Sequence, residues 1–141
     1  MGRRLKTYAS AIAPATIAAT STTAAYRIVG KSGTVVAVIF SNVDALATHA
    51  SNYVSFTLLN LGQAGAGTTD VILATAANST NSTGGTAIAA NTKRALTIHT
   101  TTANLAVTEG DRLKFVATAT GTLANTLTFP NVEILIDASG A

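Results

Sequence analysis

The stretch Asn52–Leu61, NYVSFTLLNL, decides the fold class of this chain. Strongly apolar residues alternate in it with more polar ones: Val54, Phe56 and Leu58 against Tyr53, Ser55 and Thr57. Successive side chains of a β-strand point to opposite faces of the sheet, so a period of two predicts a strand. We therefore expect a strand here with one buried face and one face toward water.

The same signal recurs along the chain between clusters of turn residues. Further strands are predicted at Ala24–Val29, Thr34–Val43, Val71–Ala74, Arg94–Thr100, Leu105–Val107, Arg112–Thr120 and Asn131–Asp137. The run Thr34–Val43, TVVAVIFSNV, is almost continuously apolar, which is typical of a strand buried on both faces. No helical pattern separates the strands, so parallel βαβ units are not expected. The fold prediction is an all-β, antiparallel β-sandwich of about eight strands.

Residues 1–23 stand apart from this pattern. They are basic at the start and then rich in Ala, Thr and Ser, without clean alternation, and Pro14 would interrupt a helix. We expect an extended N-terminal arm that lies on a neighbouring subunit, or alternatively one that packs on its own domain, residues 24–141. The pair Arg3-Arg4 resembles a twin-arginine export signal, but Lys6 and Pro14 break the apolar stretch that such a signal needs, so export is not expected.

The composition points to a protein that is packed against other proteins. The chain has 141 residues, of which 48% are hydrophobic and only 11% charged, against about 25% charged in an average domain. Its net charge is +3, without a basic stripe and interleaved aromatic residues, so nucleic-acid binding is not expected. No apolar run is long enough to span a membrane. The absence of cysteine fits a reducing cytoplasm.

Residues for catalysis or for a bound cofactor are scarce, and we expect neither an enzyme nor a cofactor. The two histidines, His49 and His99, have no carboxylate-rich neighbourhood in the sequence, so a metal site is not expected. Glu109 and Asp111 flank Gly110 and could attract calcium, but the favoured interpretation is a tight turn that Gly110 permits and Asp111 closes.

A low-complexity loop, Ala76–Ala87, contains the run NSTNSTGGT. It is polar and has no apolar anchor, so we expect it to be exposed or to lie across a partner. Asn78 and Asn81 begin glycosylation sequons, which we interpret as incidental in a protein that is not exported.

A family resemblance adds to this interpretation. A short basic arm is followed by a cysteine-free, Ala/Thr/Gly-rich chain in which EGDRLKF (109–115) opens a late strand. This arrangement resembles a jelly-roll domain, and with the size and low charge it is similar to the small jelly-roll cement, or decoration, proteins of tailed bacteriophages. The resemblance covers most of residues 24–137 and implies a jelly-roll β-sandwich.

For function, the resemblance implies a structural virion protein. Copies made in the host cytoplasm bind the outer surface of an icosahedral capsid as homodimers or homotrimers and hold neighbouring major capsid proteins together. The arm would then meet an acidic capsid surface through Arg3, Arg4 and Lys6, with Tyr8 and Ile12 as apolar anchors.

Two other functions stay open at this point. A carbohydrate- or receptor-binding module of a phage fibre needs aromatic side chains for sugar rings, for which Tyr8, Tyr26 and Tyr53 are candidates, since Phe40, Phe56 and Phe115 are expected in the core. A shell-forming jelly-roll capsid subunit is the other alternative. The chain is short for that role, and its arm carries little charge to neutralise a genome.

Overall fold

The computed structural model describes residues 5–11, 21–125, 127 and 130–138. Its strands are β1 (Leu5–Ala11), β2 (Ser21–Ile28), β3 (Gly33–Ser41), β4 (Tyr53–Asn60), β5 (Thr69–Asp70), β6 (Arg94–Leu96), β7 (Ala106–Val107), β8 (Arg112–Thr120) and β9 (Asn131–Asp137). Two short helices lie between strands: the 3-10 helix η1 (Ala76–Asn78) and α1 (Thr102–Leu105). The all-β prediction is confirmed.

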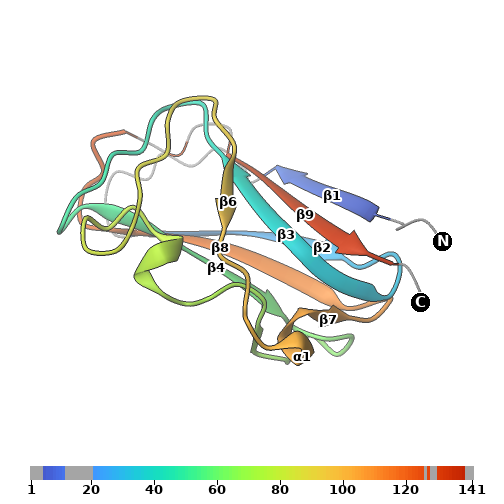
Figure 1. Ribbon diagram of the computed structural model, residues 1–141. Coiled ribbons are helices and arrows are strands. Elements are labelled where there is room, and N and C mark those ends of the chain that lie inside the picture. Colours follow the sequence, from blue (N-terminus) through green and yellow to red (C-terminus); the bar gives the residue numbers. More distant parts are fainter. Residues whose placement is uncertain (1–4, 12–20, 126, 128–129, 139–141) are drawn as a thin grey trace.

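The strands form two antiparallel sheets that face each other (Figure 1). One sheet has the order β1-β9-β3-β6, with β7 also paired to β3, and the other has the order β2-β8-β4-β5. Thus β1 pairs with β9, β2 with β8, β3 with β6, and β4 with β5. The second half of the chain retraces the first half in reverse order, and the first four strands alternate between the sheets. This is the connectivity of a jelly roll.

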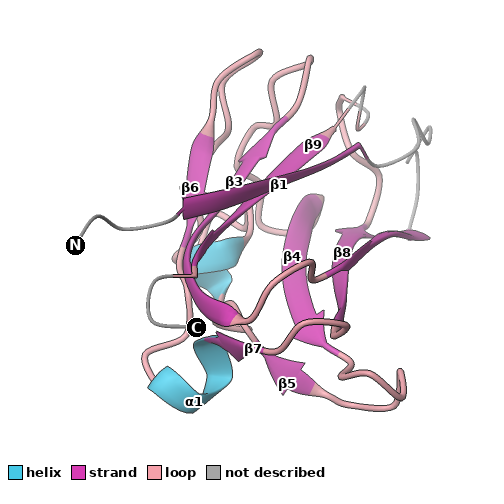
Figure 2. Cartoon of the chain, turned by 90° about the vertical axis from the view of Figure 1, so that its right-hand side faces the viewer, coloured by secondary structure: helices cyan, strands magenta, loops and turns pink. Residues whose placement is uncertain are grey.

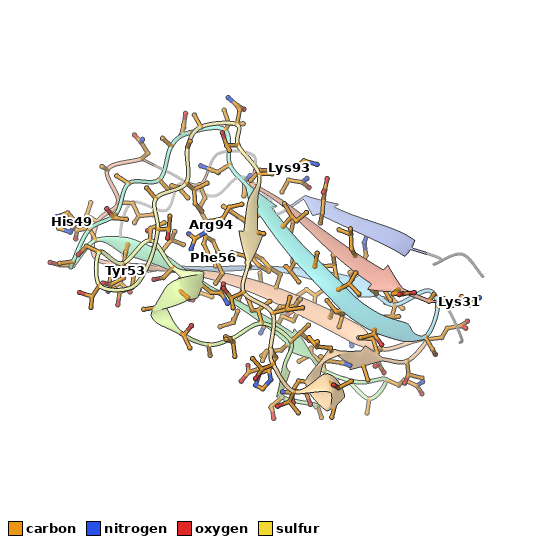
Figure 3. The ribbon with its side chains drawn as sticks, in the orientation of Figure 1. Lys31, His49, Tyr53, Phe56, Lys93 and Arg94 are labelled. Atoms are coloured by element: carbon orange, nitrogen blue, oxygen red, sulfur yellow. The ribbon has the colours of Figure 1, made fainter. Side chains whose placement is uncertain are left out.

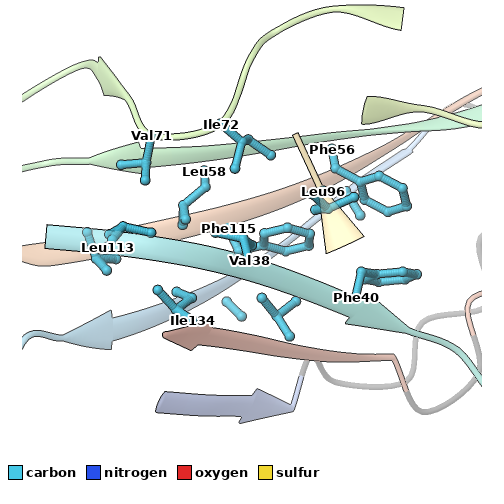
Figure 4. Packing of buried hydrophobic residues seen from close by; sticks show 14 of the residues in the cluster. Val38, Phe40, Phe56, Leu58, Val71, Ile72, Leu96, Leu113, Phe115 and Ile134 are labelled. Atoms are coloured by element: carbon cyan, nitrogen blue, oxygen red, sulfur yellow. The ribbon is translucent and has the colours of Figure 1, made fainter. Parts of the chain in front are cut away.

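Three phenylalanines occupy the middle of the core between the sheets (Figure 4). The ring centroid of Phe40, from β3, lies 4.5 Å from that of Phe56 and 6.1 Å from that of Phe115. Phe56 and Phe115 come from the opposite sheet and are 5.9 Å apart. Their predicted place in the core is confirmed. Aliphatic residues of both sheets surround the three rings, so this cluster joins the two layers.

The strand β3 differs from its prediction as a strand buried on both faces. Val35, Val38 and Phe40 are buried, whereas Ala37 and Ile39 are only half-buried. The register against β9 shifts between Val35 and Ala37, and this bulge lets both Val35 and Val38 face the core. The continuous apolar run therefore reflects a bulged strand with one inner face, rather than a strand covered on both sides.

The N-terminal segment also differs from the favoured expectation of an arm on a neighbouring subunit. Residues 5–11 form β1, which pairs with β9 of its own domain in a register from Leu5 opposite Asp137 to Ala11 opposite Asn131 (Figures 1 and 2). β9 lies between β1 and β3, so β1 covers what would otherwise be an open sheet edge. The pairing partner, rather than alternation in the segment itself, accounts for this strand.

Three further strands differ in extent from their predictions. β2 begins at Ser21, before the predicted Ala24, and β6 ends at Leu96, before the predicted Thr100. The predicted strand Val71–Ala74 is reduced to a single bridge between Ile72 and Ile98, next to the two-residue β5.

Removal of residues 2–11 should lower the free energy of unfolding of the isolated protein, because β9 loses its partner along seven positions. If each of a few ladder hydrogen bonds is worth about 1 kcal/mol net, the loss is on the order of 3 kcal/mol. Urea unfolding followed by circular dichroism measures it. A truncation of residues 2–4, which keeps β1, is the control. Equal midpoints for the truncated and full-length proteins would show that β1 is no part of the domain.

Candidate functional site

The two histidines stabilise turns. The Nδ1 atom of His49 accepts hydrogen bonds from the backbone N–H groups of Ser51, at 3.1 Å, and Asn52, at 3.0 Å. The Nδ1 atom of His99 accepts one from the N–H of Thr101, also at 3.1 Å. Across the described residues no group of three or more His, Cys, Asp or Glu side chains could hold a metal ion.

The Glu109-Gly110-Asp111 segment forms the expected tight turn. Gly110 has a φ of 92°, a conformation that other residues rarely adopt. The Oδ2 atom of Asp111 accepts hydrogen bonds from the Thr108 N–H, at 2.9 Å, and from the Asn60 side-chain amide, at 2.8 Å. Asp111 is buried, so its carboxylate closes the turn and ties it to β4. The favoured interpretation of this turn is confirmed.

The low-complexity loop is largely exposed, as predicted, but its residues 78–80 are anchored in its own domain. Asn78, Ser79 and Thr80 are buried. The Asn78 amide donates to the carbonyls of Leu73, at 2.7 Å, and Thr97, at 2.8 Å, and its oxygen accepts from the Thr97 N–H, at 2.7 Å. Asn78 thereby reinforces two chain segments that are otherwise joined by the single bridge between Ile72 and Ile98. A buried, fully bonded amide also leaves no room for a glycan.

Arg94 holds the same loop from the other side (Figure 3). Its guanidinium donates hydrogen bonds to the carbonyl oxygens of Ala77, at 2.5 Å, Ser79, at 3.1 Å, and Thr86, at 2.7 Å. Burial lowers the pKa of Arg94 from its ordinary value. Backbone carbonyls, not a carboxylate, satisfy this cation, so we assign it a structural role.

The outer face of the β2-β8-β4-β5 sheet is a candidate interaction surface. Inward positions of β8 and β4 are buried and outward positions alternate with them. The strand register aligns the outward residues in rows across the sheet. The rows are Thr22, Thr118 and Ser55; Ala24, Val116 and Thr57; and Tyr26, Lys114 and Leu59. We call this surface, with Ile28, Arg112, Tyr53 and Thr120, the outer face.

Charge is nearly absent from the outer face. Its charged members are Arg112 and Lys114, which lie together near the start of β8. The next charged residue along the Lys114 row is Asp70, on β5 beyond Leu59. The rest of the surface presents Thr, Ser, Ala, Val, Leu and Tyr side chains. A soluble domain ordinarily carries mixed charges over such an area.

One end of the outer face is both apolar and cationic. Tyr26 and Ile28 of β2 are 53% and 64% exposed. They line a hollow of about 420 Å³ together with Arg27 and Arg112. The Nζ atom of Lys114 lies 5.8 Å from the centroid of the Tyr26 ring, within the range of a cation–π contact. We call these five residues the β2–β8 patch.

A second hollow, of about 440 Å³, lies among loops beyond the start of β4. Residues 46–49 and 122–125 line it together with Asn52, Val54 and Thr80. Its lining holds no Lys, Arg, Asp or Glu. Figure 3 shows His49 and Tyr53 at this end of the sandwich, and Lys31, in the turn after β2, at the opposite end.

The structure does not bring Tyr26 and Tyr53 together as a platform for a sugar. Tyr26 pairs with Lys114 and Tyr53 pairs with Thr120, six residues further along β8. At a rise of about 3.3 Å per residue, these two tyrosines are ~20 Å apart along the strand direction. They cannot stack on the same ring.

The predicted arm contacts are only partly within the described residues. Lys6 and Tyr8 lie in β1, opposite Ile136 and Ile134 of β9, which are buried. Arg3, Arg4 and Ile12 lie outside the described residues. The two that are described are thus members of the domain's own sheet.

The sequence pattern does not predict the β2–β8 patch. It offers Tyr26 only as an aromatic residue and places Ile28 within the strand predicted at Ala24–Val29. The available signal was the string YRI at the end of a strand, in which Arg27 interrupts two apolar residues that share a face. What makes them exposed is the position of β2 at the edge of its sheet, which a single strand does not reveal.

Comparison with known proteins adds no relationship: neither a family model, nor a curated protein, nor a solved structure matches this chain. No helix among the described residues is both long and apolar enough to cross a membrane.

Replacement of Asn78 by Ala should destabilise the domain strongly, because the Leu73 carbonyl and the Thr97 N–H lose their side-chain partner and the Thr97 carbonyl keeps only its bond from the Leu73 N–H. A cost of about 2–4 kcal/mol is expected for leaving such groups unsatisfied. Asn81→Ala is the matched control, since the Asn81 oxygen accepts only a local bond from the Thr83 N–H, and should cost less than about 1 kcal/mol. Chemical denaturation measures both variants, and equal costs would contradict the anchoring role of Asn78.

Proposed function

We propose that this protein is a structural, non-catalytic component of a virion that binds the outer surface of an icosahedral phage capsid and holds neighbouring major capsid proteins together. One observation carries the proposal: a jelly-roll sandwich that leaves a broad, nearly uncharged sheet face without a covering layer among the described residues. Surfaces that are depleted of charge and end in exposed aromatic and aliphatic residues are typical of protein interfaces.

Physical reasons favour many weak contacts for such a role. A capsid presents the same protein surface many times, so a homodimer or homotrimer can engage several copies at once. Once one copy has bound, the second contact is intramolecular. Its high effective concentration compensates for the low affinity of each single contact. A stable sandwich with an uncharged face fits this use, because it can press against a partner without desolvating many charges.

The alternatives are less well supported. The separation of Tyr26 from Tyr53 disfavours a sugar platform on the outer face. For a shell-forming subunit, the isolated protein has to close into particles by itself, which electron microscopy of the purified protein would reveal. For an enzyme, the candidate acid–base side chains His49, His99 and Asp111 are engaged in local hydrogen bonds that stabilise turns, which disfavours a catalytic role for them.

Sedimentation tests the proposal directly. Purified protein is mixed with capsids assembled from the major capsid protein of the same virus and centrifuged through a sucrose cushion. We expect the protein to pellet with capsids in a saturable, fixed ratio to the shell protein, and to stay in the supernatant without them. Capsids of an unrelated phage are the control. Absence of saturable binding would refute the proposed function.

A further inference from the structure

The largest exposed apolar side chains of the described residues gather on one strand. Tyr26 and Ile28, at 53% and 64% exposure, are both on β2, and Val43, at 37%, is the remaining member of this class. β2 is an edge strand, so a partner can reach the patch from the front and from the side. The fold does not require these two side chains, because the core lies on the other face of the sheet.

Positive charge surrounds this apolar pair. Between residues 21 and 138 the chain has six Lys and Arg residues, and four of them, Arg27, Lys31, Arg112 and Lys114, belong to β2, the turn after it, or the start of β8. The other two lie at the start of β6, where Lys93 is 3.1 Å from a Glu133 oxygen and Arg94 binds loop carbonyls.

Among the described residues, no carboxylate forms an ion pair with Arg112 or Lys114. Asp111 faces the Asn60 amide and the Thr108 N–H, and Asp70 lies beyond Leu59, two strands from Lys114. Glu109 is in the adjoining turn, where its N–H binds the Ser32 hydroxyl. Arg112 lines the hollow together with Tyr26 and Ile28, and a planar guanidinium suits the two-oxygen geometry of a carboxylate.

We propose that the β2–β8 patch is a docking site for a protein surface on which Asp or Glu side chains flank an apolar recess. Ile28 and the Tyr26 ring enter the recess, and Arg112 and Lys114 meet the carboxylates at its rim. The identification of that partner as the capsid protein rests on the proposed function; the chemistry of the partner does not. An uncharged outer face beyond the patch argues against an extended phosphate backbone, which needs cations along its length.

A peptide titration tests the chemistry of the site. The probes are three short peptides in which Leu alternates with Glu, with Gln or with Lys, and a short DNA duplex, each added to isotopically labelled protein and followed by NMR. We expect the Glu peptide alone to shift the amide signals of residues 24–28 and 112–116, and the shifts to weaken as ionic strength rises. Equal shifts with the Gln peptide, or stronger and saturable shifts with the duplex, would overturn the proposal.

Matched variants locate the binding. Arg112→Gln and Ile28→Ser should each weaken binding of the Glu peptide about five- to tenfold, as expected for a charge-assisted contact and for a buried anchor. Lys93→Gln removes the same charge from the other sheet and should bind like the unchanged protein. Each variant is first checked for an unchanged unfolding midpoint. Undiminished binding by both patch variants would overturn the assignment.

Capsid sedimentation of the same variants separates the two proposals. If the unchanged protein binds capsids and the patch variants bind equally well, the capsid function stands and the docking site falls. If the unchanged protein does not bind capsids but the Glu peptide binds the patch and Arg112→Gln weakens it, the docking site stands and the capsid function falls.

Discussion

The strands β3, β4, β8 and β9 must each turn one set of residues toward one shared core, and the remainder of the structure depends on that constraint. The three packed rings of Phe40, Phe56 and Phe115 join the sheets, and they are contributed by three strands, two of them in one sheet. These are three of the chain's seven aromatic residues, and the rest of the core is aliphatic. The outward positions hold mostly Thr, Ser, Ala and a few larger apolar side chains, with Arg112 and Lys114 as the charged members, and so the outer face is nearly uncharged.

A few buried or half-buried polar side chains hold loops and turns that lie outside the main strand ladders. Asn78 and Arg94 fix the loop after β5, and Asp111 with Asn60 fixes the turn before β8. In each case the side chain binds backbone groups or an amide, which satisfies hydrogen bonds in parts of the domain where no sheet ladder reaches. Polar residues of these types also occur in active sites, but here their hydrogen bonds stabilise the fold. Among the described residues, the side chains of Arg112 and Lys114 make no such hydrogen bond.

Local alternation was sufficient to predict β4, β8 and β9 nearly to the residue, because each buries one face against the same core. It failed for β1, whose residues do not alternate and whose formation depends on the edge of β9, more than 120 positions away in the register of Lys6 and Ile136. It failed for the loop around Asn78 because burial of a polar run depends on partners such as Thr97 that come later in the chain. The β2–β8 patch was invisible for the same reason, since strand order, not sequence, places Tyr26 and Ile28 at an edge.

The position of β1 changes how docking should be understood. A free basic arm could bind a partner without cost to the domain, but a strand that completes the β9 edge is already engaged in its own sheet. A contact made by the folded outer face avoids this conflict, because it adds burial without removing a ladder. In the proposed docking the two kinds of side chain have separate effects: the cations act over several ångströms and orient the encounter, while Tyr26 and Ile28 act only in contact and set how long the complex lasts. Arg112 therefore should govern mainly association, and Ile28 mainly dissociation, which is the division expected when a charged rim surrounds an apolar centre.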